Sequence, residues 1–350
     1  MAAQDTELTG KSWKRRLEKN MSTVLLSQED IKKVINLKEV VEIVEKTFKG
    51  FGEGTTINPT KVGLDLGETA AYPPYQGFMN AMPAYVGWND VAGIKWAGGF
   101  LGERKKMGLP YITSLILLIN PKIGNFTAVM DGEWITTMRT GAQTAVALKH
   151  LHKGPTIRLG LYGAGAQGHS QTQAIAEVFD IEEVRVYDVY RPAAEKYASD
   201  MKDVVKGKVV IAETPKDAAW GDAIICVTQS KDKFVKNEWI QPGTIVFPMG
   251  SYQEVDDEFI LSADRVVVDH IGQCLHRGAL KELTEAGKFK ESDIDATIGE
   301  VVAGKKPGRI SGSDRILCIP IGTGAMDIAV ATVILEKAKA KGLGGSFDFV

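Results

Sequence analysis

The spacing of apolar residues divides the chain into regions of different predicted structure. After Ser27, which can cap a helix over 28–35, residues 37–48 carry apolar side chains at helical spacing and predict a second helix. From 58 to 129 the pattern changes to short apolar runs separated by Gly, Pro and Asn, which is typical of a mostly antiparallel sheet with tight turns. The predicted strands are 61–66, 81–86, 91–97, 114–119 and 126–130.

A helix predicted over 135–150 carries the chain into a region where short apolar runs alternate with helical segments. Alternation of this kind predicts a doubly wound parallel sheet. The predicted strands are 157–162, 184–187, 209–212, 223–228, 244–248 and 265–269. The predicted helices are 167–179, 192–203, 215–219, 278–287, 292–302 and a last, amphipathic helix over 326–341.

The predicted fold class is therefore α/β, with a Rossmann-like doubly wound parallel sheet and a second α+β domain. The 350 residues are enough for two domains with separate cores. We expect a flexible extension over 1–20, a first domain over 21–134 and 320–350, and a nucleotide-binding domain over 135–319. The last helix would either close the nucleotide-binding domain or return to the first one, and this division has it return.

A glycine-rich turn follows the predicted strand 157–162. Gly163, Gly165 and Gly168 have the spacing G-x-G-x-x-G, and the predicted helical segment begins at Gln167. The first glycine allows a tight turn, the second lets a pyrophosphate approach the backbone, and the third lets the helix pack closely on the sheet. The N-terminus of the helix presents unpaired N–H groups to phosphate. This order of elements predicts a dinucleotide-binding site.

An acidic residue, Asp188, ends the next strand, where a carboxylate can accept hydrogen bonds from the adenosine ribose hydroxyls. The same carboxylate would repel the 2′-phosphate of NADP. The predicted cofactor is therefore NAD, and NADP is less favoured. Arg191 follows closely in sequence and could offset part of this repulsion.

Composition excludes several classes of function. The formal net charge is −2 and 25% of the residues are charged, so the composition gives no excess of basic residues that would indicate nucleic-acid binding. No segment has the length of a membrane span, and the N-terminus lacks the apolar region of a signal peptide. Three widely spaced cysteines predict free thiols in a reducing compartment, and we expect a cytoplasmic protein. The histidines lack metal-ligand spacing, so no metal site is predicted.

Short motifs occur in a fixed order from about residue 21 to residue 327. They are MPA at 82–84, GIKW at 93–96, GLP at 108–110, MDG at 130–132, MRT at 138–140, the glycine turn, IGEV at 298–301, GR at 308–309 and GTGAMD at 322–327. In this order the chain resembles the ornithine cyclodeaminase/mu-crystallin family, and in particular its NAD-dependent amino-acid (alanine) dehydrogenase branch. The resemblance implies a homodimer whose first domain holds both the substrate and the dimer interface.

The activities of this family share one step, which is hydride exchange between the nicotinamide and the Cα of an amino acid. The resemblance places Lys95 and Arg139 around the substrate carboxylate, with Met82 in the substrate pocket and Lys61 where the family has an arginine. Lysine cannot make the bidentate fork of arginine. Two or three cations beside a nicotinamide would still hold a carboxylate and orient Cα. The alternative is that Lys95 and Arg139 pair with surface acids.

The remaining implied roles concern the cofactor and the proton. Lys95 and Arg139 are the predicted catalytic residues, and Lys95 is the candidate for positioning a water molecule or moving a proton. The residues predicted to contact the cofactor are Thr140, Gly163, Gly165, Ala166, Gln167, Gly168, Asp188, Arg191, Val227, Thr228, Met249 and Ser251.

Two departures from the family pattern bear on the substrate. Ser251 occupies the position of the aspartate that takes a proton from the substrate amine in cyclodeaminases, and a serine is not a comparable base. Ile319-Pro320 replaces a Lys-Ser pair near the C-terminus. We therefore predict a dehydrogenase or imine reductase of a small α-amino or α-imino acid. The alternatives are an ornithine or lysine cyclodeaminase that uses NAD catalytically, and a mu-crystallin-like protein that binds a nucleotide and a small ligand.

Overall fold

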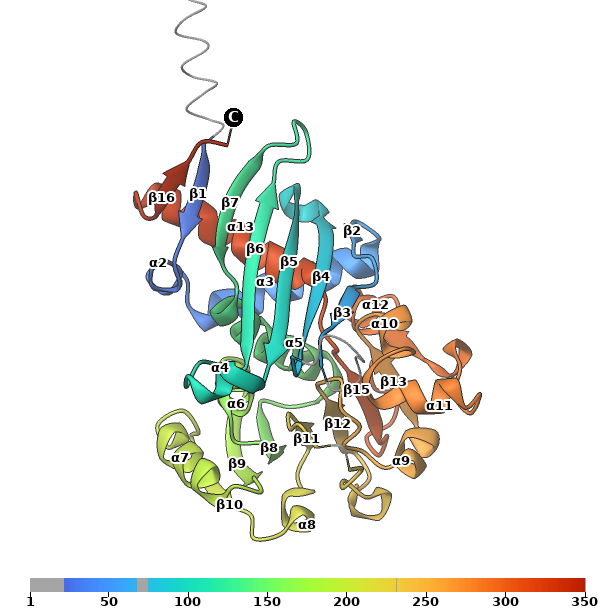
Figure 1. The fold of residues 1–350 in the computed structure, drawn as a ribbon. Helices are drawn as coiled ribbons and strands as arrows, with labels where there is room; N and C mark the ends of the chain where they lie inside the picture. The colour runs from blue at the N-terminus through green and yellow to red at the C-terminus, as the bar shows by residue number, and fades with distance from the viewer. Residues whose placement is uncertain (1–21, 68–74, 231, 350) are drawn as a thin grey trace, which may run out of the picture.

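The computed structural model describes residues 22–67, 75–230 and 232–349. Two eight-stranded sheets form the frame of the molecule, one mostly antiparallel and one entirely parallel (Figure 1). The predicted fold class is confirmed. Within these residues no helix combines the length and the apolar character that crossing a bilayer requires.

The antiparallel sheet contains all five strands that the sequence predicted in this region. Its order is β16-β1-β7-β6-β5-β4-β2, with β3 paired to β4, and only β1 and β7 run parallel. The strands are β1 (Thr23–Leu26), β2 (Thr56–Ile57), β3 (Val62–Asp65), β4 (Gly77–Val86), β5 (Val91–Phe100), β6 (Ile112–Ile119), β7 (Phe126–Asp131) and β16 (Gly345–Phe347). The sequence did not predict β1, β2 and β16, which have only two to four residues; β2 and β16 lie at the edges of the sheet, and β1 lies between β16 and β7.

Helices cover one face of this sheet. The last helix, α13, packs against β4, β5 and β6, and α3 packs against α13 from outside. Capping boxes at Ser27 and Asn36 start α2 and α3, as the sequence predicted for the first of these. The helical elements in this half are α2 (Gln28–Lys32), α3 (Leu37–Glu53), the 3-10 turn η1 (Gly87–Asn89), α4 (Gly102–Lys106) and α13 (Gly324–Ala340).

The prediction that the last helix is amphipathic was wrong. Its residues are buried almost continuously from Gly324 to Leu335, because the helix lies between the sheet and α3. In the structure Asp327 binds two basic side chains, and the Thr332 hydroxyl donates to the carbonyl of Ile328. The helix returns to the first sheet, as the predicted domain division required.

The parallel sheet has the order β10-β9-β8-β11-β12-β15-β13-β14. Its strands are β8 (Thr156–Tyr162), β9 (Asp180–Tyr187), β10 (Lys208–Ile211), β11 (Ala223–Cys226), β12 (Ile245–Pro248), β13 (Arg265–Val268), β14 (Ala296–Thr297) and β15 (Ile316–Ile319). The helices are α6 (Ala166–Ala176), α7 (Arg191–Met201), α8 (Pro215–Ala218), α9 (Asp257–Ser262), α10 (Ile271–Cys274), α11 (Lys281–Glu285) and α12 (Ile298–Val302). Three 3-10 turns complete it: η2 (Asn237–Trp239), η3 (Gly278–Leu280) and η4 (Glu291–Asp293).

Two differences from the prediction concern this sheet. The strand β15 was not predicted, although it lies between β12 and β13 and is fully buried. The predicted helix over 292–302 was wrong in its first part, which forms η4 and the short strand β14 before α12 begins. Both strands are too short to show a period, and only their parallel partners fix them as strands.

A long helix, α5 (Glu133–Leu151), connects the two halves and packs against both α3 and α6. Its packing on α6 is close, because a Cβ at Gly141 would lie 2.3 Å from the carbonyl oxygen of Ser170. The division into 21–134 with 320–350 and 135–319 stays a prediction, and the expected extension over 1–20 lies outside the described residues.

Candidate functional site

A cleft of roughly 730 Å³ opens at the carboxyl ends of β8, β9 and β11. Ligands bind at this edge of doubly wound parallel sheets. The cleft is lined by seven of the residues predicted to contact the cofactor: Gly163, Gly165, Ala166, Gln167, Asp188, Val227 and Thr228.

The three glycines of the turn have different environments. Gly163 has φ +100°, and a Cβ there would lie 2.8 Å from the carbonyl oxygen of Val227. A Cβ at Gly168 would lie 2.2 Å from the carbonyl oxygen of Gly163. At Gly165, in contrast, a Cβ would meet no described atom within 4 Å. Packing therefore requires two of the glycines, and the third leaves space at the N-terminus of α6 where a pyrophosphate fits.

The carboxylate of Asp188 binds two backbone N–H groups. One oxygen accepts from Ala164 at 2.8 Å and the other from Tyr190 at 2.9 Å. Asp188 thus fixes the glycine turn to the end of β9 and still lines the cleft. Arg191, which could have offset its charge, forms ion pairs with Glu213 at 2.7 Å and Glu195 at 3.3 Å and does not line the cleft. The carboxylate is therefore the charge that a cofactor ribose would meet.

Four other predicted cofactor residues do not line this cleft. Gly168 lies beneath the turn, and the Thr140 hydroxyl donates to the carbonyl of Thr136 at 2.6 Å. The buried sulfur of Met249 accepts a hydrogen bond from Thr144 at 3.2 Å, and Ser251 is exposed.

Glu254, which the sequence analysis did not single out, supports the wall of the cleft. Its buried carboxylate accepts hydrogen bonds from both the backbone N–H and the hydroxyl of Thr228. Burial raises the pKa of Glu254 to about 7, and the two bonds from Thr228 oppose that rise.

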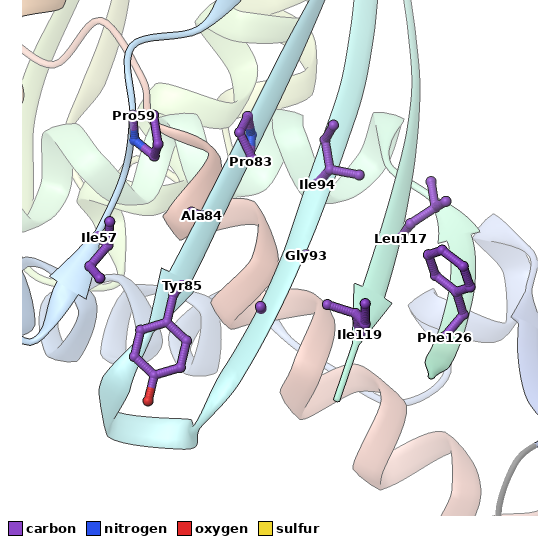
Figure 2. Close-up of a pocket in the computed structure, with 11 residues that line it drawn as sticks. Ile57, Pro59, Pro83, Ala84, Tyr85, Gly93, Ile94, Leu117, Ile119 and Phe126 are labelled. Carbon is purple, nitrogen blue, oxygen red and sulfur yellow. The ribbon is translucent and has the colours of Figure 1, made fainter. Parts of the chain in front are cut away.

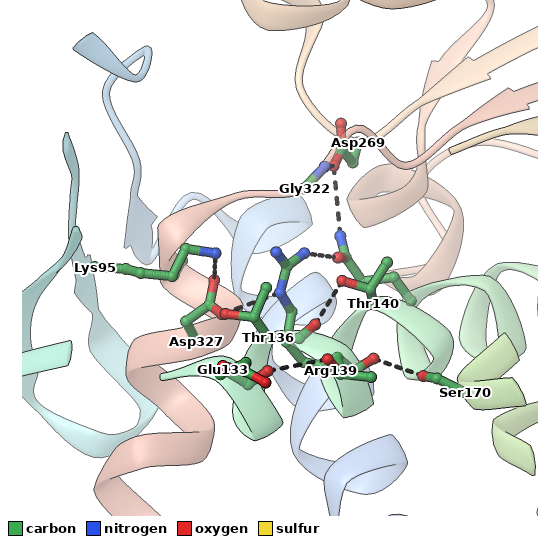
Figure 3. Close-up of polar contacts among 12 residues, drawn as sticks. Lys95, Glu133, Thr136, Arg139, Thr140, Ser170, Asp269, Gly322 and Asp327 are labelled. Carbon is green, nitrogen blue, oxygen red and sulfur yellow. Dashed lines mark hydrogen bonds and ion pairs between the residues drawn. The ribbon is translucent and has the colours of Figure 1, made fainter. Parts of the chain in front are cut away.

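Lys95, Arg139 and Asp327 form a buried cluster beside α5 (Figure 3). Lys95 projects from β5, Arg139 from α5 and Asp327 from α13. The Lys95 Nζ lies 2.7 Å from one carboxylate oxygen of Asp327, and the Arg139 Nε lies 3.1 Å from the other. The hydroxyl of Thr136 also donates to Asp327 at 3.0 Å. The alternative that Lys95 and Arg139 pair with surface acids is wrong, because their shared acid is buried.

Burial sets the protonation of this cluster. Burial first and the charge of Arg139 second lower the pKa of Lys95 to about 7, although Asp327 opposes both effects. Burial alone would raise the pKa of Asp327, but Arg139 and Lys95 hold it below its usual value. Asp327 is thus an anion between two cationic side chains, and Lys95 can exchange a proton near neutral pH.

Lys61 lies in the segment before β3, near enough to this cluster for its charge to lower the pKa of Lys95. Burial lowers its pKa to about 8, and the nearby charge of Arg277 contributes next. The buried Asp269, at the end of β13, accepts a hydrogen bond from the N–H of Gly322 at 2.7 Å. A Cβ at Gly322 would lie 2.7 Å from Arg139, so this glycine lets the guanidinium approach the backbone.

Met82 is buried on β4 and contacts the start of α13, where a Cβ at Gly324 would lie 2.4 Å from its carbonyl oxygen. It packs beside the cluster without contributing a polar group.

The sequence analysis missed three charged residues of this site: Asp269, Arg277 and Asp327. A signal existed for Asp327, because it ends the GTGAMD motif. Asp269 and Arg277 stand in no motif that was recognised, and only the fold brings them to Lys61.

The helix α5 joins the cofactor cleft to the cluster. Thr137 lines the cleft, whereas Thr136 and Arg139 contact Asp327. The carbonyl of Thr137 also accepts a hydrogen bond from Ser170 of α6 at 2.6 Å. A substrate carboxylate held by the cations would therefore lie next to the wall of the cofactor cleft.

Comparisons with known proteins match most of the chain. The sequence profile described as the ornithine cyclodeaminase/mu-crystallin family matches residues 21–342. The alanine dehydrogenase of Archaeoglobus fulgidus is 34% identical over 333 residues, which cover 94% of this chain and 99% of that protein. A solved archaeal alanine dehydrogenase dimer with bound NAD is 34% identical, with a TM-score of 0.86 over 94% of this chain and 100% of its own.

A second solved structure is the Δ1-pyrroline-2-carboxylate reductase of Thermococcus litoralis, in complex with NADH and L-proline. It is 31% identical, with a TM-score of 0.85 over 92% of this chain and 99% of its own. The resemblance inferred from the sequence motifs is confirmed.

Proposed function

Because this chain belongs to the ornithine cyclodeaminase/mu-crystallin family, we propose that it exchanges hydride between NAD and the Cα of a small α-amino or α-imino acid. It is an NAD-dependent amino-acid dehydrogenase or imine reductase. The observation that carries this proposal is the junction at α5, where a dinucleotide cleft meets a buried cluster of basic side chains.

The cofactor cleft fits NAD rather than NADP. When bound, NAD supplies the acceptor or donor of the hydride. Gly165 leaves room for a pyrophosphate at the N-terminus of α6, and Asp188 lines the cleft where a ribose hydroxyl can donate to it. Asp188 would repel a 2′-phosphate, and Arg191 is occupied by Glu213 and Glu195.

The basic side chains hold the other reactant and move its proton. The Nε of Arg139 donates to Asp327 and its Nη1 donates to Gln143, so Nη2, together with Lys61, binds the α-carboxylate and fixes Cα against the cleft wall. With a pKa of about 7, Lys95 donates a proton from Nζ to the amine side of the substrate in one direction and accepts it in the other. Asp327 stays charged and orients both Lys95 and Arg139.

Cyclodeamination is the rival activity within the same family. It requires a base beside the substrate amine, and Ser251, at the position where the resemblance places that base, is an exposed serine. We therefore expect net oxidation or reduction rather than catalytic use of NAD.

An assay panel tests the proposed function. Single amino acids would be supplied with NAD, and α-keto acids with ammonia would be supplied with NADH, followed by NADH absorbance and ammonia release. Net NADH change with at least one pair supports the proposal. Proline and ammonia formed from ornithine without net NADH change would contradict it and favour the cyclodeaminase.

The proposal includes a homodimer formed through the uncovered face of the antiparallel sheet. Outward positions on that face are apolar, and Ile57 and Trp96 are 62% and 53% exposed. A hollow of roughly 360 Å³ lies among Ile57, Tyr85, Ile94 and Phe126, with α13 on the opposite side of the strands (Figure 2). An apolar face of this kind is typical of a protein interface.

Light scattering after gel filtration measures this assembly. The wild-type chain should elute as a dimer, and Leu117→Arg, which places a charge on this face, should give a monomer that still binds NAD. A wild-type monomer would contradict the dimer. The proposal also includes a cytoplasmic location, which agrees with three cysteines that are free and buried.

A further inference from the structure

Two cations at the substrate site have no partner in the described part of the chain. Neither Lys61 nor Arg277 donates a hydrogen bond or forms an ion pair with any described residue. Arg309 provides a contrast within the same protein, because it is also half-buried and donates to four carbonyls, those of Leu151, Gly243, Gly312 and Asp314. The donors of Lys61 and Arg277 are not sealed from solvent, so they are free to bind a ligand.

The two cations lie close to each other. A Cβ at Gly63 would lie 3.0 Å from Nη2 of Arg277, so the guanidinium rests against the backbone of β3, two residues after Lys61. The charge of Arg277 is also the largest cause, after burial, of the lowered pKa of Lys61. The residues come from opposite halves of the molecule, because Arg277 follows α10 of the parallel-sheet half.

The charges around the site do not balance. Its four cations are Lys61, Lys95, Arg139 and Arg277. Only two carboxylates face them: Asp327, which is bound by Lys95 and Arg139, and Asp269, which accepts from the backbone of Gly322. While Lys95 holds its proton, as it must before it donates one in the reductive direction, two positive charges are left over, and one α-carboxylate would neutralise only one of them.

We propose that the substrate is a dicarboxylic α-amino or α-imino acid, whose second carboxylate is bound by Arg277 with Lys61. This inference rests on the proposed function and adds the class of substrate. Arg277 is then a specificity-determining residue, because the planar guanidinium binds a carboxylate through two parallel hydrogen bonds. Lys61 lies between the two carboxylates, which explains why a lysine there suffices without a fork.

Steady-state kinetics with NAD and either L-aspartate, L-glutamate or L-alanine test the proposal. In the wild-type enzyme, kcat/KM for one of the dicarboxylic acids should exceed that for alanine by at least about tenfold. Arg277→Gln should lower kcat/KM for the preferred dicarboxylic acid by roughly 30-fold or more, and change that for alanine less than about twofold. Arg277→Lys should recover part of the loss. Lys281→Gln, which removes an exposed cation four residues away, is the matched control and should change neither.

Dead-end binding keeps the test independent of turnover. Succinate and butyrate, which match in length and differ by one carboxylate, would be titrated by calorimetry into the enzyme saturated with NADH. Succinate should bind at least about tenfold more tightly, and Arg277→Gln should remove that difference while NADH affinity stays unchanged. Equal binding of the two acids, or an equal loss for both in the variant, would overturn the inference.

The two proposals fail in different ways. NADH formation from alanine but from neither dicarboxylic acid would overturn the substrate class and leave the proposed function intact. Absence of NADH formation and of NADH consumption across the whole panel would overturn the proposed function, and the succinate titration would then judge the role of Arg277 alone.

Discussion

The cofactor cleft and the basic cluster meet at one helix but are built in opposite ways. Most of the predicted cofactor residues that line the cleft come from the continuous stretch 163–188, and the cleft has empty space at Gly165. The cluster takes single charged side chains from β5, α5 and α13, and from the segments before β3 and after α10.

This difference determines how each half responds to substitution. A change at Gly165, where a side chain would meet no described atom, should weaken one ligand and leave the fold intact. Lys95 and Arg139 are buried together and share Asp327, so removing one of these charges alters the protonation and position of the others. Substitutions in the two halves can therefore test the contrast directly.

The largest effect is expected for Asp327→Asn. The change keeps the shape of the side chain but leaves Lys95 and Arg139 buried without their anion. The free energy of unfolding should fall by roughly 3–5 kcal/mol, as when one partner of a buried pair is removed. Urea denaturation measures this loss. In the folded fraction kcat/KM should fall on the order of 10³-fold, equivalent to about 4 kcal/mol.

Asp200→Asn is the control for that substitution, because Asp200 also binds two basic side chains, Lys196 and His169, but at the surface. Its unfolding curve should match the wild type. Equal destabilisation by the two substitutions would show that the buried cluster is not special.

In the cleft, Gly165→Val should weaken NAD binding by roughly 30-fold, about 2 kcal/mol, because the side chain would fill the space left for the pyrophosphate. The fold should be unaffected, since a Cβ there meets no described atom within 4 Å. Calorimetric titration with NAD and a thermal melt separate the two effects.

Gly163→Ala gives the reverse pattern and serves as the matched control. Its φ of +100° and the nearby carbonyl of Val227 should reduce the free energy of unfolding by roughly 1–3 kcal/mol. If Gly165→Val destabilised the fold as much as Gly163→Ala, the space at Gly165 would be structural rather than a ligand site.

A smaller effect is expected at Asp188. Asp188→Ser removes the repulsion of a 2′-phosphate but also weakens the bonds that hold Ala164 and Tyr190. NAD affinity should fall roughly fivefold while NADP affinity rises, so the preference for NAD narrows. Titration of both cofactors measures the ratio. Tighter binding of NADP than of NAD by the wild type would contradict the assignment.

The smallest effect concerns pH. The oxidative kcat/KM should rise through about pH 7 as Lys95 loses its proton. Lys61→Met removes a positive charge that lowers the pKa of Lys95, so this limb should move to higher pH by less than about one unit. A pH profile of each enzyme shows the shift, and an unmoved limb would mean that another group titrates there.

The pH dependence of the free energy of unfolding gives a second measurement of the titration of Lys95. Above a folded-state pKa of about 7 the folded chain holds fewer protons at Lys95 than the unfolded chain, whose lysine keeps its ordinary pKa of 10.5. The free energy of unfolding therefore gains a contribution that rises with pH between these two values. Lys95→Met should remove that rise from urea denaturation curves.

The contrast between the halves also explains what the sequence could predict. The glycine turn, Asp188 and the strands around them follow one another in the chain, so local spacing was enough to place the cleft. Lys95 and Arg139 were found through short motifs, but their pairing with Asp327 depends on α13 crossing the sheet from residue 324 onwards. The sequence analysis predicted an amphipathic helix here and therefore did not predict that the part carrying Asp327 is buried.

Arg277 and β15 show more clearly what local sequence patterns cannot predict. Arg277 reaches Lys61 only because two halves of the chain, more than two hundred residues apart, come together at β3. The strand β15 has four residues and is defined by its neighbours β12 and β13. Neither a side-chain type nor a local period can report contacts of that range.

The packing of α5 has a consequence for the precision of the reaction. The single helix α5 contacts α6 at Gly141 and Thr137. Through Thr136 and Arg139 it also contacts Asp327 of the buried cluster. Both reactants would therefore be positioned by contacts to the same helix, rather than each by its own sheet. Substitutions at residues away from α5, such as Arg277, could then change the substrate preference without changing the distance of hydride transfer.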